Sequence, residues 1–275
     1  MRNPNITIDH AALRLDGLEV AYPNGVRALA RTSLSIEKGC FVVLLGSSGA
    51  GKSTLLRAVN GLVRLTAGTM TADGIDVLSN KASMRQFRRQ TGMVFQQHHL
   101  IGRLSVLSNV LMGRLGYHGS LATLLPWSRQ EKRMALEAIE RVGLLSQALF
   151  RADQLSGGQQ QRVGIARALI QKPRLLLADE PVASLDPATA ENLLTLLHGI
   201  CRADGLTVIV SLHQVELARN FADRIIGLNA GYVVFDGSAS ALGSVEEASL
   251  YKSMATPSTT DSKLIIPTAF QTQGA

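Results

Sequence analysis

Short apolar runs alternate with helical patterns along most of the chain. The run at residues 41–45 is entirely apolar, and those at 174–178 and 206–212 are apolar at most positions, as is typical of strands covered on both faces of a parallel sheet. The second and third runs are followed by polar residues, which would lie together at one edge of that sheet. The pattern therefore predicts an α/β fold with chemistry at the carboxyl ends of its strands.

The beginning of the chain has a different pattern. Residues 13–36 form short segments of alternating polarity, and YPNG at residues 22–25 contains the Asn-Gly pair most typical of a tight hairpin. We therefore predict a small antiparallel sheet that leads into the strand at 41–45. Tyr22 precedes the turn and offers a flat face for a purine ring, although an ordinary hairpin tyrosine explains it equally well.

A brief strand is predicted at residues 92–97, and apolar residues recur at helical spacing from about Ser105. The strand ends in Gln96 and Gln97, which suits a side chain that must reach a ligand. Residues 113–127 are punctuated by glycine and carry exposed-looking Leu, Tyr and Trp residues. These residues either fill the core or form a surface for a partner.

Two further helices follow. Ser128 and Glu131 have capping-box spacing at the start of a helix predicted over residues 128–142. Another helix is predicted from Ser156 to about residue 171. Its first turn contains glycines and no acidic residue, so its free amides could receive an external anion. The alternative is that Ser156 simply caps the helix.

Composition narrows the class of protein. A chain of 275 residues, 46% apolar and 18% charged, suits one large α/β domain or a domain with an inserted subdomain. It contains no secretory-type leader and no apolar stretch near the roughly 18 residues of a membrane span, so we expect a cytosolic chain. Cys40 and Cys201 lack metal-ligand spacing and are expected to be reduced and buried. The net charge is +7, but the sequence has no dense block of Lys and Arg residues interleaved with aromatic residues. The basic residues are therefore better explained as a solvated face than as a nucleic-acid-binding site.

The strongest motif follows the strand at 41–45. GSSGAGKST fits the phosphate-loop pattern, in which glycines curl backbone amides around phosphates, the lysine reaches the β and γ phosphates, and the serine can bind Mg²⁺. The predicted nucleotide-binding residues are Gly46, Ser47, Ser48, Gly49, Ala50, Gly51, Lys52, Ser53 and Thr54.

Carboxylates and a histidine follow the later strands. Asp179 ends the run RLLLAD and is assigned to Mg²⁺, as in phosphate-loop ATPases. Glu180 comes one residue later and is our candidate for polarising the attacking water. His213 ends the last core run and could form a hydrogen bond near the γ-phosphate. Asp186 precedes a proline, so a helix N-cap is a real alternative for it.

Together these motifs resemble the ATP-binding cassette (ABC) superfamily over roughly residues 13–237. The resemblance implies that Tyr22 stacks on adenine, that Gln96 is a Q-loop residue that contacts Mg²⁺, and that His213 is a switch histidine; Gln96 and His213 then act with Glu180 in catalysis. The signature motif comprises Leu155, Ser156, Gly157, Gly158 and Gln159, and the D-loop comprises Ser184, Leu185 and Asp186.

The resemblance implies an α/β architecture: a phosphate-loop (RecA-like) core, an antiparallel β subdomain, and an α-helical subdomain at about 96–171. The cassette would span residues 1–240, followed by a C-terminal extension at 241–275 that loosens from about 256. Two copies would dimerise head to tail on ATP and Mg²⁺, the signature of one copy acting on the other's ATP. The dimer would drive two membrane-spanning permease subunits at the cytoplasmic face of the bacterial inner membrane, served indirectly by an extracytoplasmic solute-binding protein.

A closer resemblance is to the ATPase subunits of bacterial phosphonate importers. It rests on RLSVLSNVLMGRLG, ADEPVASLDP, SLHQVELA and LYKSM, and on the Leu-His-Gln sequence at 212–214, where many importers have Thr-His-Asp. Phosphate, phosphite or another small anion remains an alternative solute. An exporter cassette and a soluble nucleic-acid-associated ATPase are the rival classes. Residues 113–127 and the region after Gln96 are expected to receive the permease.

Overall fold

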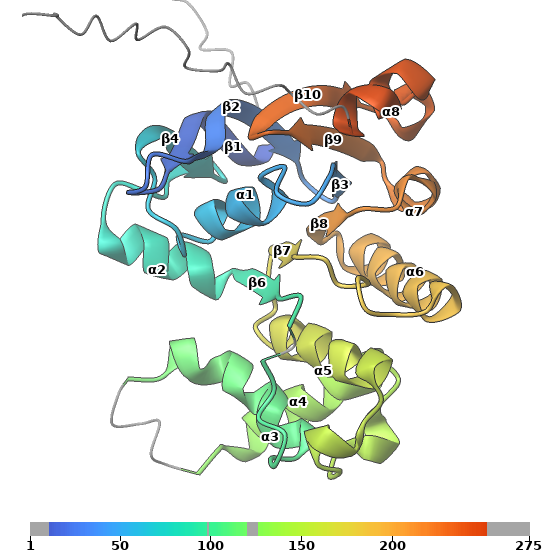
Figure 1. Ribbon diagram of the computed structural model, residues 1–275. Helices are drawn as coiled ribbons and strands as arrows, with labels where there is room; N and C mark the ends of the chain where they lie inside the picture. The colour runs from blue at the N-terminus through green and yellow to red at the C-terminus, as the bar shows by residue number, and fades with distance from the viewer. Residues whose placement is uncertain (1–10, 98, 120–125, 252–275) are drawn as a thin grey trace, which may run out of the picture.

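The computed structural model describes residues 11–97, 99–119 and 126–251. Its strands form two sheets (Figure 1). The first sheet is antiparallel and has the order β2-β1-β4-β5. Its strands are β1 (Ala11–Ala21), β2 (Arg27–Glu37), β4 (Ala67–Ala72) and β5 (Ile75–Asp76). The predicted antiparallel sheet is thus confirmed, with Gly25 N–H donating to the Tyr22 carbonyl at 2.9 Å in its first turn.

The second sheet has the order β10-β9-β3-β8-β7-β6, and only β10 runs antiparallel to its neighbour. Its strands are β3 (Phe41–Leu45), β6 (Thr91–Val94), β7 (Leu175–Ala178), β8 (Thr207–Leu212), β9 (Arg224–Asn229) and β10 (Tyr232–Gly237). The carboxyl ends of β3, β8 and β7 are adjacent because β3 pairs with β8 and β8 pairs with β7, both in parallel. This arrangement brings the predicted polar residues to one edge.

Eight α-helices lie within the described residues: α1 (Lys52–Val59), α2 (Lys81–Arg89), α3 (Val106–Leu111), α4 (Arg129–Arg141), α5 (Gly157–Leu169), α6 (Pro187–Asp204), α7 (Val215–Phe221) and α8 (Ser244–Tyr251). Figure 1 shows α3, α4 and α5 gathered on one side of the molecule, away from α1 and the antiparallel sheet. A 3-10 helix, η1 (Met112–Tyr117), follows α3. None of the helices in this described part is long and apolar enough to cross a membrane.

Central strand β3 shows why the molecule has two hydrophobic cores. All five of its residues are buried, and their side chains alternate between the two faces of the sheet. Phe41, Val43 and Leu45 enter one core, whereas Val42 and Leu44 enter the other. The second core also holds α1 and the apolar face of the antiparallel sheet, which fixes the phosphate-loop helix between the two sheets.

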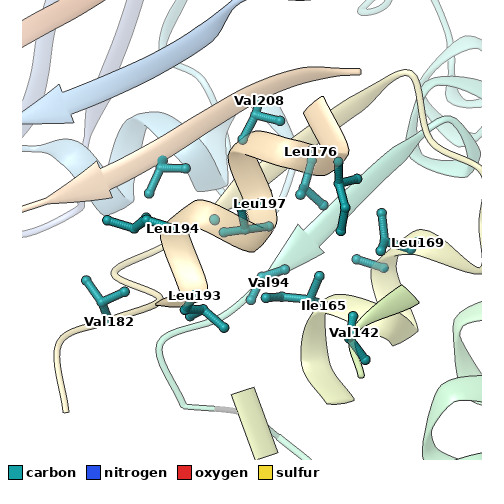
Figure 2. Packing of buried hydrophobic residues seen from close by; sticks show 14 of the residues in the cluster. Val94, Val142, Ile165, Leu169, Leu176, Val182, Leu193, Leu194, Leu197 and Val208 are labelled. Atoms are coloured by element: carbon teal, nitrogen blue, oxygen red, sulfur yellow. The ribbon is translucent and has the colours of Figure 1, made fainter. Parts of the chain in front are cut away.

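The helices α3, α4 and α5 form a helical segment. The first core joins this helical segment to the second sheet (Figure 2). Leu176 and Val208 enter it from the sheet, Leu197 from α6, Ile165 from α5 and Val142 from the end of α4, and all five are fully buried. Burying a side chain of this size contributes about 1.5–3 kcal/mol before entropic costs. The helical segment and the sheet therefore share their stabilising contacts.

Local sequence signals explain the helix starts. The Ser128–Glu131 capping box of α4 is present: the Ser128 hydroxyl accepts from Glu131 N–H at 3.2 Å, and the Glu131 carboxylate accepts from Ser128 N–H at 3.3 Å. Ser105 caps α3 by accepting from Ser108 N–H at 3.1 Å.

The strand predicted at residues 92–97 is wrong in its second half. β6 pairs only with β7, and the last pair of that ladder joins Val94 to Ala178. Gln96 therefore lies in a bend beyond the strand rather than at its end. The strand expected to reach His213 likewise stops one residue earlier, at Leu212.

The residues at 113–127 divide between surface and core. Leu115 is 42% exposed, whereas Tyr117 and Trp127 are half-buried, so the two aromatics follow the core-filling alternative. Tyr117 Oη donates to the backbone oxygen of Arg89 at 2.6 Å, which turns its ring inward. Part of this stretch, and the predicted loosening of the tail beyond residue 256, lie outside the described residues.

Candidate functional site

The phosphate loop connects β3 to α1, and its conformation depends on glycine. Gly49 and Gly51 have φ values of 78° and 105°, which side-chain-bearing residues rarely adopt. Gly46 lies so close to β9 that a Cβ there would be 2.2 Å from the Leu228 carbonyl oxygen. Gly51 caps α1 without a side-chain hydrogen bond, and the first turn holds no acidic residue. The amides at this helix start are therefore available to an anion.

Lys52 lies under the loop with 3% of its surface exposed. Its Nζ donates to the carbonyl oxygens of Gly46 at 2.7 Å and Ser47 at 3.0 Å. Burial lowers the pKa of Lys52, and the nearby carboxylates of Glu180 and Asp179 oppose that effect. The ammonium thus stands inside the loop, where phosphate oxygens could replace the two carbonyls as its partners.

Asp179 follows β7 and is 1% exposed. Its carboxylate accepts hydrogen bonds from Ser53 Oγ at 2.7 Å and Ser211 Oγ at 3.1 Å, and Arg57 lies 3.4 Å away. A serine hydroxyl facing a buried aspartate supplies the oxygen ligands that Mg²⁺ prefers. The donor set at Ser53 and Asp179 therefore fits Mg²⁺.

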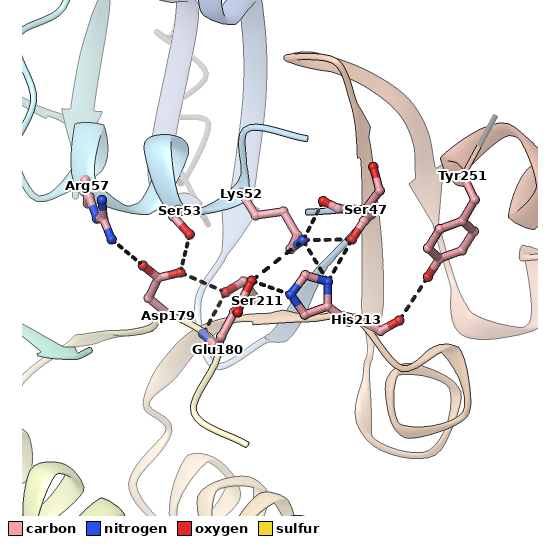
Figure 3. A network of polar contacts seen from close by, with 10 residues as sticks. Ser47, Lys52, Ser53, Arg57, Asp179, Glu180, Ser211, His213 and Tyr251 are labelled. Atoms are coloured by element: carbon pink, nitrogen blue, oxygen red, sulfur yellow. Dashed lines mark hydrogen bonds and ion pairs between the residues drawn. The ribbon is translucent and has the colours of Figure 1, made fainter. Parts of the chain in front are cut away.

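Glu180 and His213 complete this group (Figure 3). His213 Nε2 contacts Glu180 Oε1, and His213 Nδ1 lies 3.3 Å from Lys52 Nζ. The lysine can only donate, so the tautomer that suits both contacts carries its proton on Nε2. Glu180 has φ of 47°, in the left-handed region, and its N–H donates to Ser211 Oγ at 2.8 Å. The backbone after β7 is thereby turned so that the Glu180 carboxylate meets His213.

Sequence reasoning missed three residues that contact this group. Ser211 is fully buried and links Asp179 to the Glu180 backbone. Its position two residues before His213 was a usable signal, because alternate residues of a strand share a face. Arg57 and Tyr251 gave no comparable signal, since their contacts depend on how distant elements pack.

Other predicted nucleotide-binding residues lie at the loop tip or apart from the cluster. Ser48 and Gly49 are exposed, Ala50 is buried and Thr54 is half-buried. Tyr22 is 40% exposed in its hairpin. Gln96 is exposed in the bend after β6 and makes none of the contacts that join Lys52, Asp179, Glu180 and His213.

The signature residues also lie apart, at the start of α5 (Figure 1). Ser156 and Gln159 form a reciprocal capping box, with Ser156 Oγ accepting from Gln159 N–H at 3.4 Å and Gln159 Oε1 accepting from Ser156 N–H at 3.0 Å. Leu155 is buried, whereas Ser156 and Gly157 are exposed. The helix-cap interpretation of Ser156 is thus present in the structure, and the capping box uses the N–H groups of Ser156 and Gln159 rather than those of the two glycines between them.

The D-loop precedes α6 and adjoins the signature. A Cβ on Gly158 would lie 2.8 Å from Thr189 Cγ2, so this glycine permits the two helix starts to approach closely. Asp186 caps α6 by accepting from Thr189 N–H at 3.0 Å. Hydrogen bonds from the Thr189 side chain and then from its backbone lower the pKa of Asp186. Ser184 is exposed and Leu185 is half-buried. The alternative N-cap role of Asp186 is therefore confirmed.

Comparisons with known proteins agree with this geometry. The family described as "ABC transporter" matches residues 29–183. The chain is 60% identical over 264 residues to the "Phosphonates import ATP-binding protein PhnC 2" of Cupriavidus metallidurans, covering 96% of this chain and 95% of that protein. It is 53% identical over 249 residues to the "Phosphite import ATP-binding protein PxtA" of Stutzerimonas stutzeri, covering 90% of each.

A solved structure shares the same fold. It is a dimeric, post-hydrolysis state of the ATP-binding cassette MJ0796 bound to ADP and Pi, with a TM-score of 0.73 and 36% identity over 82% of this chain and 98% of that one. The family match, the close relatives and the shared fold agree with one another. The chain belongs to the ABC transporter family, as an ATP-binding cassette.

Proposed function

We propose that this chain is the ATP-hydrolysing subunit of an importer for a small phosphorus oxyanion, with phosphonate as the solute. The observation that carries the ATPase activity is the cluster of Lys52, Asp179, Glu180 and His213 at the mouth of the phosphate loop. The solute assignment rests on the likeness to phosphonate import proteins. The phosphite import relative makes phosphite the second candidate.

The residues of the cluster suit different parts of the reaction. The loop amides and Lys52 bind the β and γ phosphates and neutralise charge that develops on them. Ser53 and Asp179 would hold Mg²⁺, which would neutralise negative charge on the phosphates when bound. Glu180 orients a water for attack on the γ-phosphorus and accepts its proton.

His213 adjoins both the proposed base and the phosphate-binding lysine. Its Nε2 contacts Glu180 while its Nδ1 faces Lys52, so nucleotide binding that draws Lys52 away also frees the ring. We assign His213 the role of sensing the γ-phosphate together with Gln96. Gln96 is exposed in the bend after β6, and its role requires it to move toward the Mg²⁺ site.

The signature is proposed to act on a partner's ATP. In a head-to-tail homodimer, the outward-facing amides after Ser156 would close over the γ-phosphate held by the other copy's Lys52. ATP then joins the two copies, and hydrolysis separates them. Tyr22, exposed at the first hairpin, is assigned to stacking on adenine.

The movement is proposed to pass to two membrane-spanning permease subunits at the cytoplasmic face of the bacterial inner membrane. A groove of about 560 Å³ lies between α2, the end of β6, η1 and α5, beside the bend that holds Gln96. Arg85, Arg88 and Arg89 line it together with Tyr117 and Phe95. Its charge suits an amphipathic cytoplasmic helix that carries acidic residues.

Growth on defined phosphorus sources tests the proposed function. Cells lacking this ATPase are supplied with methylphosphonate, phosphite or phosphate as sole phosphorus source. We expect failure on methylphosphonate alone, rescued by the intact chain and not by Glu180→Gln. Failure only on phosphite would select the second candidate, and normal growth on all three would overturn the solute assignment.

A further inference from the structure

Helix α8 packs against the β9–β10 hairpin and lies beside it in Figure 1. Leu250 is fully buried and lies against Gly227, where a Cβ would be only 2.3 Å from Leu250 Cδ2. Glycine at position 227 therefore makes room for the leucine. Asn229 Nδ2 donates to the Ser249 carbonyl at 2.8 Å, which adds a polar anchor beside the apolar one.

A second anchor comes from α7. The Arg219 guanidinium donates to the Leu242 carbonyl at 3.1 Å and pairs with the Glu247 carboxylate at 2.9 Å. These contacts hold both the approach to α8 and the helix itself. The end of α8 is thus restrained from two sides, by β9 and by α7.

The restrained end of α8 forms a hydrogen bond to the proposed catalytic cluster of Lys52, Asp179, Glu180 and His213. Tyr251, the last residue of α8, donates from Oη to the backbone carbonyl of His213 at 3.0 Å (Figure 3). Burial raises the pKa of Tyr251, and the carboxylates of Glu247 and Glu216 raise it further. The phenol therefore remains a donor throughout the neutral pH range.

His213 lies in the short connection between the end of β8 and the start of α7. Its backbone carbonyl receives Tyr251, while its ring contacts Glu180 and faces Lys52. Restraining that peptide limits the directions in which the ring can point. We propose that Tyr251 is a positioning residue for ATP hydrolysis, which holds His213 where its imidazole meets Glu180.

This inference rests on the proposed ATPase function and goes beyond it. Tyr251 lies outside residues 29–183, where the family match falls, and its hydrogen bond within the described part of the chain goes to the His213 backbone rather than to a phosphate-binding residue. It acts only through His213. A helix near the C-terminus would thereby set the rate of a reaction whose chemical groups all come from other elements.

The test replaces one hydroxyl. Tyr251→Phe is made in the full chain, assembled with its permease in proteoliposomes, beside the control Tyr232→Phe on β10. The two tyrosines are similarly exposed, at 43% and 48%. Loss of one hydrogen bond predicts that kcat falls about three- to tenfold in Tyr251→Phe, with KM for ATP unchanged, while Tyr232→Phe matches the unmutated chain.

A double variant separates positioning from general loosening. In a His213→Ala background, Tyr251→Phe should change kcat no further, because the ring that it positions is absent. Equal losses in both backgrounds, or an unchanged kcat in the single variant, would overturn the role of Tyr251. Absence of turnover in the unmutated chain would instead overturn the ATPase proposal, and this one with it.

Discussion

The catalytic cluster and the start of α5 satisfy their polar groups in opposite ways. In the cluster, Lys52, Asp179, Glu180 and His213 bond to one another or to adjacent backbone, and Asp179 and Lys52 are almost fully buried. At the start of α5, the internal contacts include the capping box and the Gln160 side chain, whereas Gly157 is exposed and Gly158 is half-buried. One region is organised within a single chain, whereas the other presents donors without an acceptor of its own.

In the proposed head-to-tail dimer, this contrast would keep the shared site from premature turnover. The cluster holds its charges in place before nucleotide arrives, because each charged group already has a partner. The helix start costs little to leave exposed, since water satisfies its amides. Catalysis would then require a second chain to bring the two regions together. Five experiments test the two regions and the helical segment.

The largest effect is expected at Glu180. Glu180→Gln keeps the side-chain length and removes the base, so kcat should fall about a thousandfold while ATP still binds. The variant should accumulate as an ATP-bound dimer, measured by size-exclusion chromatography with and without ATP. Hydrolysis at the unmutated rate would show that the base lies elsewhere.

The next effect is expected at Ser156. Aspartate caps helices as well as serine does, so Ser156→Asp should keep α5 folded while its charge repels phosphate, lowering kcat about a hundredfold. Ser105→Asp, at the cap of α3, is the matched control and should retain activity. Thermal unfolding checks that both variants remain folded.

Mixing variants sharpens the same test. A dimer of one Ser156→Asp chain and one Lys52→Ala chain contains one intact site only if each site draws on both chains. Activity should therefore return on mixing two inactive preparations. No recovery, with heterodimers present, would place the signature and the phosphate loop of one chain in the same site.

A smaller effect is expected within the cluster. Ser211→Ala leaves the Glu180 N–H without its buried acceptor, which should reduce the free energy of unfolding by about 1–3 kcal/mol. We expect kcat to fall by about tenfold, because Asp179 also loses a donor. Urea unfolding and ATP turnover measure the two effects. Ser146→Ala, at an exposed serine, should change neither.

The smallest effect concerns the helical segment. Burial opposes ionisation of Glu131, but hydrogen bonds from His118 and Ser128 outweigh it and hold the pKa of Glu131 below its ordinary value of 4.5. A lowered folded-state pKa stabilises the protein above the ordinary value, and this stabilisation is lost as pH falls through the folded-state pKa. Acid should therefore loosen α4 below about pH 4.5.

Glu131→Gln should cost about 1 kcal/mol near pH 7, where it removes the charged half of the capping box, and flatten the loss of stability in acid. Glu137→Gln is the matched control on the same helix, because Glu137 pairs only with exposed Arg133. Urea unfolding at a series of pH values measures both. Identical acid slopes for the two variants would contradict the role of Glu131.

Much of the cluster could be predicted because its residues follow strands that the apolar pattern marks clearly. Asp179 and His213 come directly after fully buried strands of a parallel sheet, where strand ends meet at one edge. The capping boxes were equally predictable, since they depend on residues three positions apart. Local spacing was sufficient in each case.

Contacts between distant elements could not be predicted. Tyr251 reaches His213 only because Leu250 fits over Gly227, and no local pattern encodes that fit. Gln96 was placed at a strand end because the apolar run continues to it, whereas the edge strand stops where its only neighbour ends. Hydrogen-bond partners in the sheet, rather than residue preference, decided that boundary.

The left-handed backbone of Glu180 also restricts what evolution can place there. At φ of 47°, a β-branched side chain would be severely strained, whereas an unbranched one is tolerated at modest cost. The residue at position 180 must therefore meet two requirements: its side chain must accept a proton, and its shape must be compatible with the left-handed backbone. Backbone strain alone excludes threonine and valine at this position, whatever the chemistry of their side chains.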